Sequence, residues 1–331
     1  MEKRVVLIVP YFGKFPNYFE CWKKSAIANE EFDFLIFTDN SEYKSEKNIK
    51  FVYMEFEEFK SIIQRCVKFK INLQEPYKIC DYRPLFGQAL KEYISKYEFW
   101  GFCDVDLIFG DLSHFVTNQI LNSYDKVYKL GHLTIIKNND MCNSLWLQKH
   151  HLKGIYRYDE AFSTPRACHF DEMLGLTELA HLKNLKVYDK TDFADVAPNR
   201  FNFHLIGKDE KISDGVFQWK EGNLFYFYKL NNKIKKIEVA YAHFQKRCLK
   251  VSSTNDDDIF YIIPNVITNS LNIYQYLNRK PRNIFYYSYY KKRIETMLKN
   301  ILKHDAIKQR LYIKFFQTSY RKKFLDKHEG L

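Results

Sequence analysis

The sequence predicts an α/β fold: a mixed, mainly parallel β-sheet flanked by helices, followed by a basic, mainly helical C-terminal region. Three observations predict it. Apolar, strand-like runs alternate with helix-like segments through the first 140 residues, an alternating β pattern occupies 215–244, and Lys and Arg gather after residue 278. With 331 residues, 46% of them hydrophobic, the chain is long enough for one large domain and an appendage.

The N-terminal part supplies the strands of the predicted sheet. Residues 4–12, RVVLIVPYF, form a compact β-branched run that is typical of a strand covered on both faces. Further strands are expected at 32–40, 49–56, 97–112 and 126–140, with helices at 17–31 and 86–98. This alternation is typical of a parallel sheet, in which ligands bind beyond the carboxyl ends of the strands.

Residues 215–244 predict a β-meander. Apolar and polar residues alternate there, and two turn signals interrupt the pattern, Glu221-Gly222-Asn223 and Asn231-Asn232. The segment before it, 140–205, is expected to be helical and irregular. Because the meander ends at His243, we expect one domain at 1–248 and a separate basic, aromatic, mainly helical region at 249–331.

The basic character belongs to the C-terminal tail. The net charge is +12, and residues 279–331 hold 15 Lys/Arg against 4 Asp/Glu, so the preceding chain is nearly neutral. Helical spacing places apolar positions of the tail on one face: Ile294, Met297, Leu298, Ile301 and Leu302. A membrane-surface segment and a helical cap on the domain are the two favoured interpretations, and nucleic-acid binding is not favoured.

Seven cysteines without a CxxC pair argue against a disulfide framework and a structural zinc site. The N-terminal apolar run lacks the pattern of a signal peptide, and no apolar stretch is long enough to cross a bilayer. We therefore expect a cytoplasmic protein, which would lie peripherally on the inner face of the cell membrane if its tail binds lipid.

Two carboxylates, Asp104 and Asp106, interrupt the apolar run YEFWGFCDVDLIFGDL at 97–112. Burying a charge is costly unless it is paired or binds a metal. Residues i and i+2 of a regular strand point the same way, so both carboxylates can converge on a hard cation such as Mg²⁺ or Mn²⁺. An acidic turn is the alternative interpretation. Asp111 follows a glycine and is expected to form a turn or helix cap.

Seven short motifs occur in a fixed order: VPYFGKFPNYF, FDFLIFTDN, PYKICDYRPLFG, FWGFCDVDLIFGD, GHLTIIKNN, FDE and YAHFQKR. An apolar strand leading into Asp-x-Asp after an N-terminal βα region resembles the GT-A glycosyltransferases. The seven motifs together resemble a bacterial GT-A-like family associated with capsular and cell-surface polysaccharide loci. The resemblance covers about residues 5–248 and implies a GT-A-like, Rossmann-related fold.

The resemblance also implies a metal site and a leaving-group site. Asp104, Asp106 and His243 would hold Mn²⁺ or Mg²⁺ on the diphosphate of a nucleotide sugar. Lys246 or Arg247 would neutralise the departing diphosphate, a task for which ammonium and guanidinium groups are both suited. A lone histidine is otherwise more often structural than a ligand, so the role of His243 depends on the resemblance.

The nucleotide contacts are expected in two places. The first is the ends of the first two strands, and the second is PYKICDYRPLFG, whose cations and acceptor precede a helix that favours anions. The residues concerned are Tyr11, Gly13, Asp39, Lys78, Asp81 and Arg83. Tyr11 would pack on the base, and Gly13 would allow close backbone approach. An ordinary turn or surface ion pair is the alternative at each place.

Asp171 and Glu172, in HFDEMLG, are the candidate catalytic residues. The resemblance places a carboxylate or amide here, near the anomeric carbon of the donor sugar. An inverting enzyme needs a base for the acceptor hydroxyl, whereas a retaining enzyme stabilises an oxocarbenium-like state, and the sequence leaves both open. A helix N-terminus bearing acids is the alternative. His132 is expected to contact the donor sugar or the acceptor.

The predicted function is therefore a metal-dependent glycosyltransferase of hexosyltransferase type. It would move a sugar from a nucleoside-diphosphate donor, UDP-linked in our interpretation, to a hydroxyl of a surface glycan or lipid-linked glycan of capsule, exopolysaccharide or lipopolysaccharide. Two alternatives stay open: a sugar-phosphate nucleotidyltransferase, and a non-catalytic nucleotide- or glycan-binding protein with the same fold. No P-loop, GxGxxG or GxSxG signature occurs.

Overall fold

The computed structural model describes residues 3–152, 154–173, 175–198, 200–208, 214–252 and 258–279, together with residues 291, 294, 295 and 298. The chain forms two compact units. The first comprises Met1–Ala197 and Asn202–Pro281 and contains every sheet described below. The second comprises Pro198–Phe201 and Arg282–Leu331.

In the second unit, the described tail residues are helical and exposed: Lys291, Ile294, Glu295 and Leu298. The other apolar positions of the predicted tail helix, Met297, Ile301 and Leu302, lie outside the described residues. None of the helices in the described part of the chain has the length and apolar character that a membrane-spanning helix needs.

The first unit is built on a seven-stranded sheet with the order β3-β2-β1-β4-β7-β6-β8. Its strands are β1 (Val5–Pro10), β2 (Phe32–Thr38), β3 (Ile49–Tyr53), β4 (Phe99–Cys103), β6 (Lys126–Val127), β7 (Leu133–Lys137) and β8 (Val187–Tyr188). Every neighbouring pair is parallel except the two that β7 makes, with β4 and β6. The predicted mixed, mainly parallel α/β sheet is confirmed.

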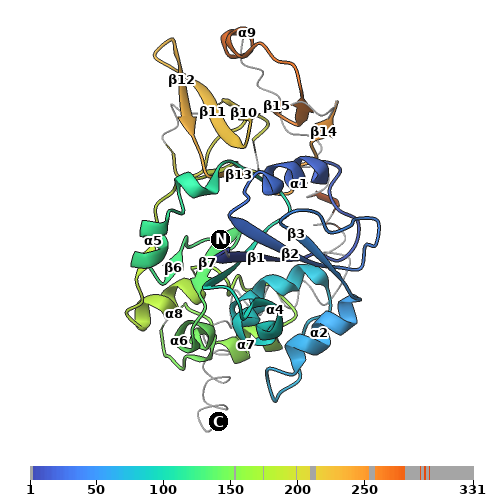
Figure 1. The fold of residues 1–331 in the computed structure, drawn as a ribbon, viewed down its shortest axis with the longest axis vertical. Helices are drawn as coiled ribbons and strands as arrows, with labels where there is room; N and C mark the ends of the chain where they lie inside the picture. The colour runs from blue at the N-terminus through green and yellow to red at the C-terminus, as the bar shows by residue number, and fades with distance from the viewer. Residues whose placement is uncertain are drawn as a thin grey trace. The chain divides into compact units, whose positions relative to one another are not determined.

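Helices cover both faces of this sheet, with α1 on one side and α2, α4, α6 and α7 on the other (Figure 1). The α-helices are α1 (Phe19–Ile27), α2 (Phe56–Gln64), α3 (Phe86–Ala89), α4 (Lys91–Ile94), α5 (Asn118–Ser123), α6 (Asp140–Asn143), α7 (Tyr158–Ser163), α8 (Leu176–Leu182) and α9 (Ile273–Asn278). Among the described residues, the 3₁₀ helices are η1 (Pro76–Leu85), η2 (Leu112–His114) and η3 (Leu145–Leu147). Strand β1 buries alternate residues in two cores, Val6 and Ile8 on one face and Leu7 on the other, as expected for a strand covered on both faces.

The predicted β-meander is confirmed as β10 (Val216–Lys220), β11 (Asn223–Leu230) and β12 (Lys233–Glu238). Its two hairpin turns contain Glu221-Gly222 and Asn231-Asn232, all four with positive φ, which Gly and Asn adopt readily. Strands β14 (Lys250–Val251), β15 (Ile259–Ile263) and β16 (Val266–Thr268) complete this second sheet. Because β15 pairs with β10, the compact unit continues past the expected boundary at residue 248.

Two predicted strands are divided in the structure. The expected strand at 126–140 is an antiparallel pair, β6 and β7, separated by a loop at 128–132. The expected strand at 97–112 is β4, a turn, and then β5 (Leu107–Phe109). Strand β5 belongs to a three-stranded sheet in which β13 (Tyr241–His243) lies between β5 and β9 (Ala194–Asp195). His243 therefore ends a strand that has left the meander.

Candidate metal and nucleotide-sugar site

Asp104 and Asp106 lie in the turn between β4 and β5, at the carboxyl end of a central parallel strand. The Asp104 N–H donates to the His132 carbonyl at 3.0 Å, and the Asp104 carbonyl accepts from the Trp22 indole at 3.1 Å. These bonds fix the turn. The two carboxylates therefore meet through a turn, and the strand alternation that the sequence suggested is not what places them.

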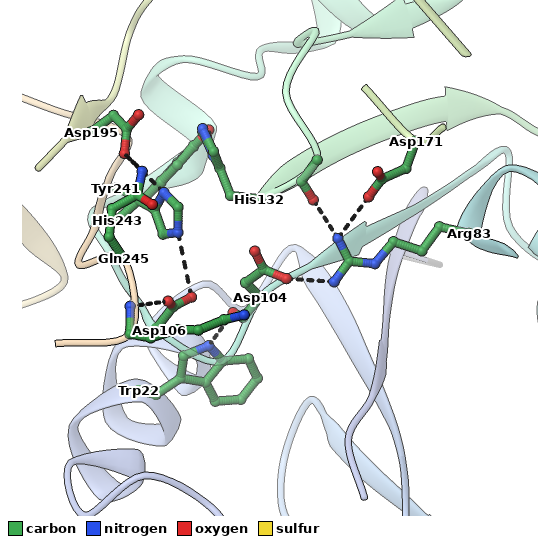
Figure 2. A network of polar contacts seen from close by, with 12 residues as sticks. Trp22, Arg83, Asp104, Asp106, His132, Asp171, Asp195, Tyr241, His243 and Gln245 are labelled. Carbon is green, nitrogen blue, oxygen red and sulfur yellow. Dashed lines mark hydrogen bonds and ion pairs between the residues drawn. The ribbon is translucent and has the colours of Figure 1, made fainter. Parts of the chain in front are cut away.

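Pairing of β13 with β5 brings His243 beside Asp106. The His243 Nε2 lies 3.6 Å from Asp106 Oδ1, and its Nδ1 lies 2.9 Å from Asp195 Oδ1 (Figure 2). The other Asp106 oxygen accepts the Lys246 backbone N–H at 2.6 Å. The imidazole is thus held between two carboxylates, and Asp195 fixes the orientation of its ring.

The charges of Asp106 and His243 stabilise each other. Burial by itself raises the pKa of Asp106, but the neighbouring His243 and the Lys246 N–H lower it to about 2. Burial lowers the pKa of His243, but Asp106 and Asp195 raise it to about 10. In this arrangement Asp106 is a carboxylate at neutral pH, and the proton on His243 occupies the side where a cation would bind.

The residues fit a divalent cation. Asp104, Asp106 and His243 each offer one ligand atom, and these three atoms lie within 4.8 Å of one another. Two carboxylate oxygens and one imidazole nitrogen are a donor set that suits Mn²⁺ or Mg²⁺. A cation here would replace the proton on His243 while Asp195 keeps the ring in place.

Arg83 joins Asp104 to a third acid. Its guanidinium forms an ion pair with Asp104, a 3.0 Å bond to Asp171 Oδ2 and a 2.8 Å bond to the Gly131 carbonyl (Figure 2). Burial raises the pKa of Asp171 to about 8, although Arg83 opposes the shift. Gly131 must be a glycine, since a Cβ would stand 2.6 Å from Asp171 Oδ2. Residues from η1, the β4–β5 turn and the loop before α8 therefore meet at one guanidinium.

Lys78 and Asp81 are not at the edge of this site. Both are buried, and they form an ion pair with each other inside the first unit. The Lys78 ammonium also donates to the carbonyls of Ala161 and Arg166. The Asp81 carboxylate accepts the backbone N–H groups of Cys168 and Phe170, each at 2.8–3.0 Å. With both side chains fully engaged, the expected nucleotide contacts of Lys78 and Asp81 are not available in this arrangement.

The residues after β1 and β2 do come together. The Gly13 N–H donates to Asp39 Oδ1 at 2.7 Å, and Gly13 adopts a φ of 100°. The Tyr11 ring stacks on Phe15 with centroids 4.8 Å apart, and its hydroxyl donates to the Lys14 carbonyl. The carboxyl ends of the two neighbouring strands thus present an exposed carboxylate and a half-buried aromatic ring, at the edge of the sheet where the sequence predicts a nucleotide.

The remaining candidates divide between the site and the interior. His132 is buried, its Nδ1 lies 2.9 Å from the Tyr241 hydroxyl, and its ring lies 4.5 Å from that of His243. Burial lowers the pKa of His132 well below its ordinary value, so the ring is neutral. Arg247 is turned inward and donates to the Ala197 carbonyl at 2.8 Å. Arg247 is therefore poorly placed to reach a diphosphate.

Glu172 and Lys246 lie closer to solvent. Glu172 is half-buried, with its carboxylate 3.8 Å from the His169 ring. The Lys246 ammonium lies over the ring of Tyr77, 3.8 Å from the ring centre. Sequence reasoning missed Tyr77 and Asp195. Asp195 gives no local signal because its role arises only from the parallel pairing of β9 with β13.

Comparison with known proteins gives a family and a set of structural neighbours. Residues 7–271 match the family described as Family of unknown function (DUF6625). The chain belongs to the DUF6625 family. No protein with a curated description matches this DUF6625 sequence.

Among solved structures, this DUF6625 protein is similar to the galactosyltransferase LgtC in complex with donor and acceptor sugar analogs. The TM-score is 0.38 at 13% identity, over 73% of this chain and 88% of LgtC. It is also similar to the apo form of the glycosyltransferase GlyE of Streptococcus pneumoniae TIGR4, with a TM-score of 0.33 at 10% identity, over 58% of this chain. The DUF6625 chain spans 46% of the GlyE chain.

Proposed function

We propose that this DUF6625 protein is a divalent-metal-dependent glycosyltransferase. It transfers a sugar from a nucleoside-diphosphate donor, UDP-linked, to a hydroxyl of a bacterial surface glycan. The convergence of Asp104, Asp106 and His243 on one point beyond the carboxyl end of β4 carries the proposal. Asp39 and Gly13, at the ends of the neighbouring strands, give the nucleotide a place beside that point.

Each group has a part in this reaction. A bound Mn²⁺ or Mg²⁺ supplies Lewis-acid stabilisation of the departing diphosphate. Lys246 adds a mobile positive charge on the open side of the site, and Arg83 holds Asp104 and Asp171 in register. Asp171, which bonds to this guanidinium, and the adjacent Glu172 are the proposed carboxylates beside the anomeric carbon. His132, neutral and packed on His243, lines the same cluster.

The acceptor class and location belong to the same proposal. We propose a glycan or lipid-linked glycan acceptor of capsule, exopolysaccharide or lipopolysaccharide assembly, on the cytoplasmic side of the membrane. Contact of the basic tail with an anionic inner leaflet would bring the enzyme to such an acceptor. Most residues of that tail lie outside the described part of the chain.

Donor hydrolysis tests the proposal because it needs no acceptor. A set of nucleotide sugars is incubated with the protein, with and without Mn²⁺, and the nucleoside diphosphate released is measured. We expect metal-dependent release from at least one UDP-sugar. Release of pyrophosphate from a sugar phosphate and UTP would instead identify a nucleotidyltransferase, and binding of UDP without any turnover would identify a binding protein.

Asp106→Asn is the decisive variant. We expect its Mn²⁺ affinity, measured by calorimetry, to fall by about 100-fold or more, and metal-dependent release to fall with it. Asp111→Asn is the matched control, because Asp111 caps η2 through the Ser113 N–H and has no part in the site. Unchanged Mn²⁺ affinity in Asp106→Asn would contradict the metal assignment.

A further inference from the structure

Tyr77 is an exposed aromatic residue that stands beside the proposed site. It lies on η1, and 56% of its surface is exposed. Burial is the largest cause that raises the pKa of Tyr77 to about 12, and the nearby Asp104 and Asp171 add to the shift. These acids are therefore the electrostatic neighbours of the ring. An exposed ring beside these acids is accessible to a ligand.

The face of the Tyr77 ring is covered by a cation from the other side of the site. The Lys246 ammonium lies 3.8 Å from the ring centre, in a cation–π contact. Tyr77 and Lys246 are far apart in sequence, so two separate segments meet over the cluster of acids. The contact is exposed to water, where cation–π interactions are weak.

The backbone that carries Lys246 is held in an unusual conformation by Asp106 and Asp195. Gln245 and Lys246 have φ values of 52° and 59°, in the left-handed region that side chains rarely adopt. The Lys246 N–H bonds to Asp106 Oδ2, and the Gln245 amide bonds to Asp195 Oδ1 at 2.7 Å. Strain of this kind persists where the surroundings over-determine it, and here it directs the Lys246 side chain across the site.

An aromatic face that attracts an ammonium also attracts the C–H groups of a sugar ring, because both carry positive charge toward the negative face of the π system. A nucleoside diphosphate offers Lys246 a stronger partner than an exposed ring, since charge-assisted bonds to phosphate oxygens exceed an exposed cation–π contact. The Lys246 ammonium can therefore exchange the Tyr77 ring for a diphosphate. When the ammonium binds the diphosphate, the face of the ring becomes free.

We propose that the Tyr77 ring is the binding platform for the acceptor sugar, a pyranose that stacks through its C–H face. Lys246 covers the platform until the diphosphate of the donor draws the ammonium away. This inference rests on the proposed function, in which Lys246 binds the donor diphosphate. It makes acceptor binding follow donor binding, so that the platform opens only when there is a sugar to transfer.

Ligand-observed saturation-transfer NMR tests the platform with methyl β-D-glucopyranoside and methyl β-D-galactopyranoside as probes. In the wild-type protein we expect UDP with Mn²⁺ to strengthen binding of at least one probe by about fivefold or more. Lys246→Met keeps the length of the side chain without its charge, so its probe binding should be strong with or without UDP. Tyr77→Ala should lose the binding about fivefold, whereas Tyr77→Phe should retain it.

Tyr274→Ala is the matched control, because Tyr274 is an exposed tyrosine on α9 with 70% of its surface accessible. Its probe binding should equal that of the wild type. Thermal unfolding of every variant establishes that the comparison is made between folded proteins. Two results would overturn the platform. One is that Tyr77→Ala binds the probes as well as the wild type does. The other is that neither the wild type nor Lys246→Met binds a probe under any condition.

Calorimetry of UDP with Mn²⁺ separates this inference from the proposed function. If UDP does not bind, the proposed function fails. The platform is then tested only by comparing Lys246→Met with the wild type, and stronger probe binding by Lys246→Met supports it. If UDP binds but Tyr77→Ala weakens binding of uridine in place of the probes, Tyr77 stacks on the base, and the inference is overturned while the function stands.

Discussion

The 3₁₀ helix η1 carries two ionic arrangements that differ in almost every respect. Lys78 and Asp81 form a closed pair, whose remaining bonds go to backbone groups of the 161–170 segment. Arg83, two residues further on, donates to two carboxylates and a carbonyl at the proposed site. Asp104, one of those carboxylates, is partly exposed, whereas Asp81 is not.

The difference teaches how one charged motif can serve two purposes. The closed pair ties η1 to the loop before α8 and so sets where Arg83 stands. The open cluster holds Asp104 and Asp171, and in the proposed function Asp104 would also bind the metal ion. Breaking a buried pair that has all its bonds made is strongly destabilising, whereas a cluster with exchangeable partners is available for chemistry. Four predictions test this distinction.

The largest effect is expected from Asp81→Ala. Removing the carboxylate leaves the Lys78 ammonium buried without its counter-ion and two backbone N–H groups buried without their acceptor, which costs about 3–5 kcal/mol of unfolding free energy. Urea unfolding measures it. The matched control is Glu57→Ala, because Glu57 pairs with Lys60 at the same three-residue spacing but is exposed. We expect about 0.5 kcal/mol or less there, and equal losses in both variants would remove the distinction.

Arg83→Lys should affect activity more than stability. A single ammonium cannot reproduce the fork that joins Asp104, Asp171 and the Gly131 carbonyl. We expect metal-dependent donor hydrolysis to fall about 10- to 100-fold, with a stability loss well below that of Asp81→Ala. The opposite pattern, a large loss of stability with full hydrolysis per folded molecule, would show that Arg83 belongs with the closed pair.

Lys126 can be compared with Lys78, because both lysines are buried. Among the described residues, Lys126 donates to a backbone carbonyl but forms no salt bridge. Burial lowers its pKa to about 7, against opposing effects of Asp171 and Glu172. The unfolded chain keeps this proton up to about pH 10.4, so it binds more protons between pH 7 and 10 and stability rises with pH there. In Lys126→Met we expect about 1 kcal/mol more stability at pH 7 and a smaller rise toward pH 9.

The smallest effect is expected at the surface. His114 bonds to Glu238 at 2.7 Å and is half exposed, and that bond is the main cause that raises its pKa. The protonated pair stabilises the fold below the unfolded pKa of about 6.5, and this stability is lost as the pH rises through the higher folded value. Glu238→Gln should flatten that slope by about 0.5 kcal/mol or less, measured by unfolding at pH 5 and pH 8. A larger change would indicate a pair that water does not screen.

The sequence predicts features that depend on neighbouring residues. Strand β1 is a run of apolar residues that both cores need, and the hairpin turns of the meander contain Gly222 and the Asn231-Asn232 pair that positive φ favours. The sheet and the meander follow from such local patterns. The helices at 86–98 are also present, although α3 and α4 divide the segment between them.

Features that depend on distant partners were beyond the sequence. The burial of Lys78 and Asp81 depends on carbonyl and N–H groups 83 to 89 residues away, so PYKICDYR reads as an open, charged motif. His243 stands beside Asp106 only because β13 pairs with β5. The resemblance to GT-A enzymes pointed to both His243 and Asp106. The turn that presents Asp106 and the support from Asp195 come from tertiary pairing alone.

The position of β13 has a consequence for synthesis on the ribosome. Six of the seven strands of the main sheet and both aspartates have been made once β7 ends at Lys137, whereas His243 follows about 100 residues later. At bacterial or eukaryotic translation rates that interval is roughly 5 to 20 s. During it, Asp106 lacks its imidazole and β5 lacks its partner strand. During this interval the nascent chain therefore carries an unpaired acid and an open strand edge. Binding by a chaperone would matter most at this stage.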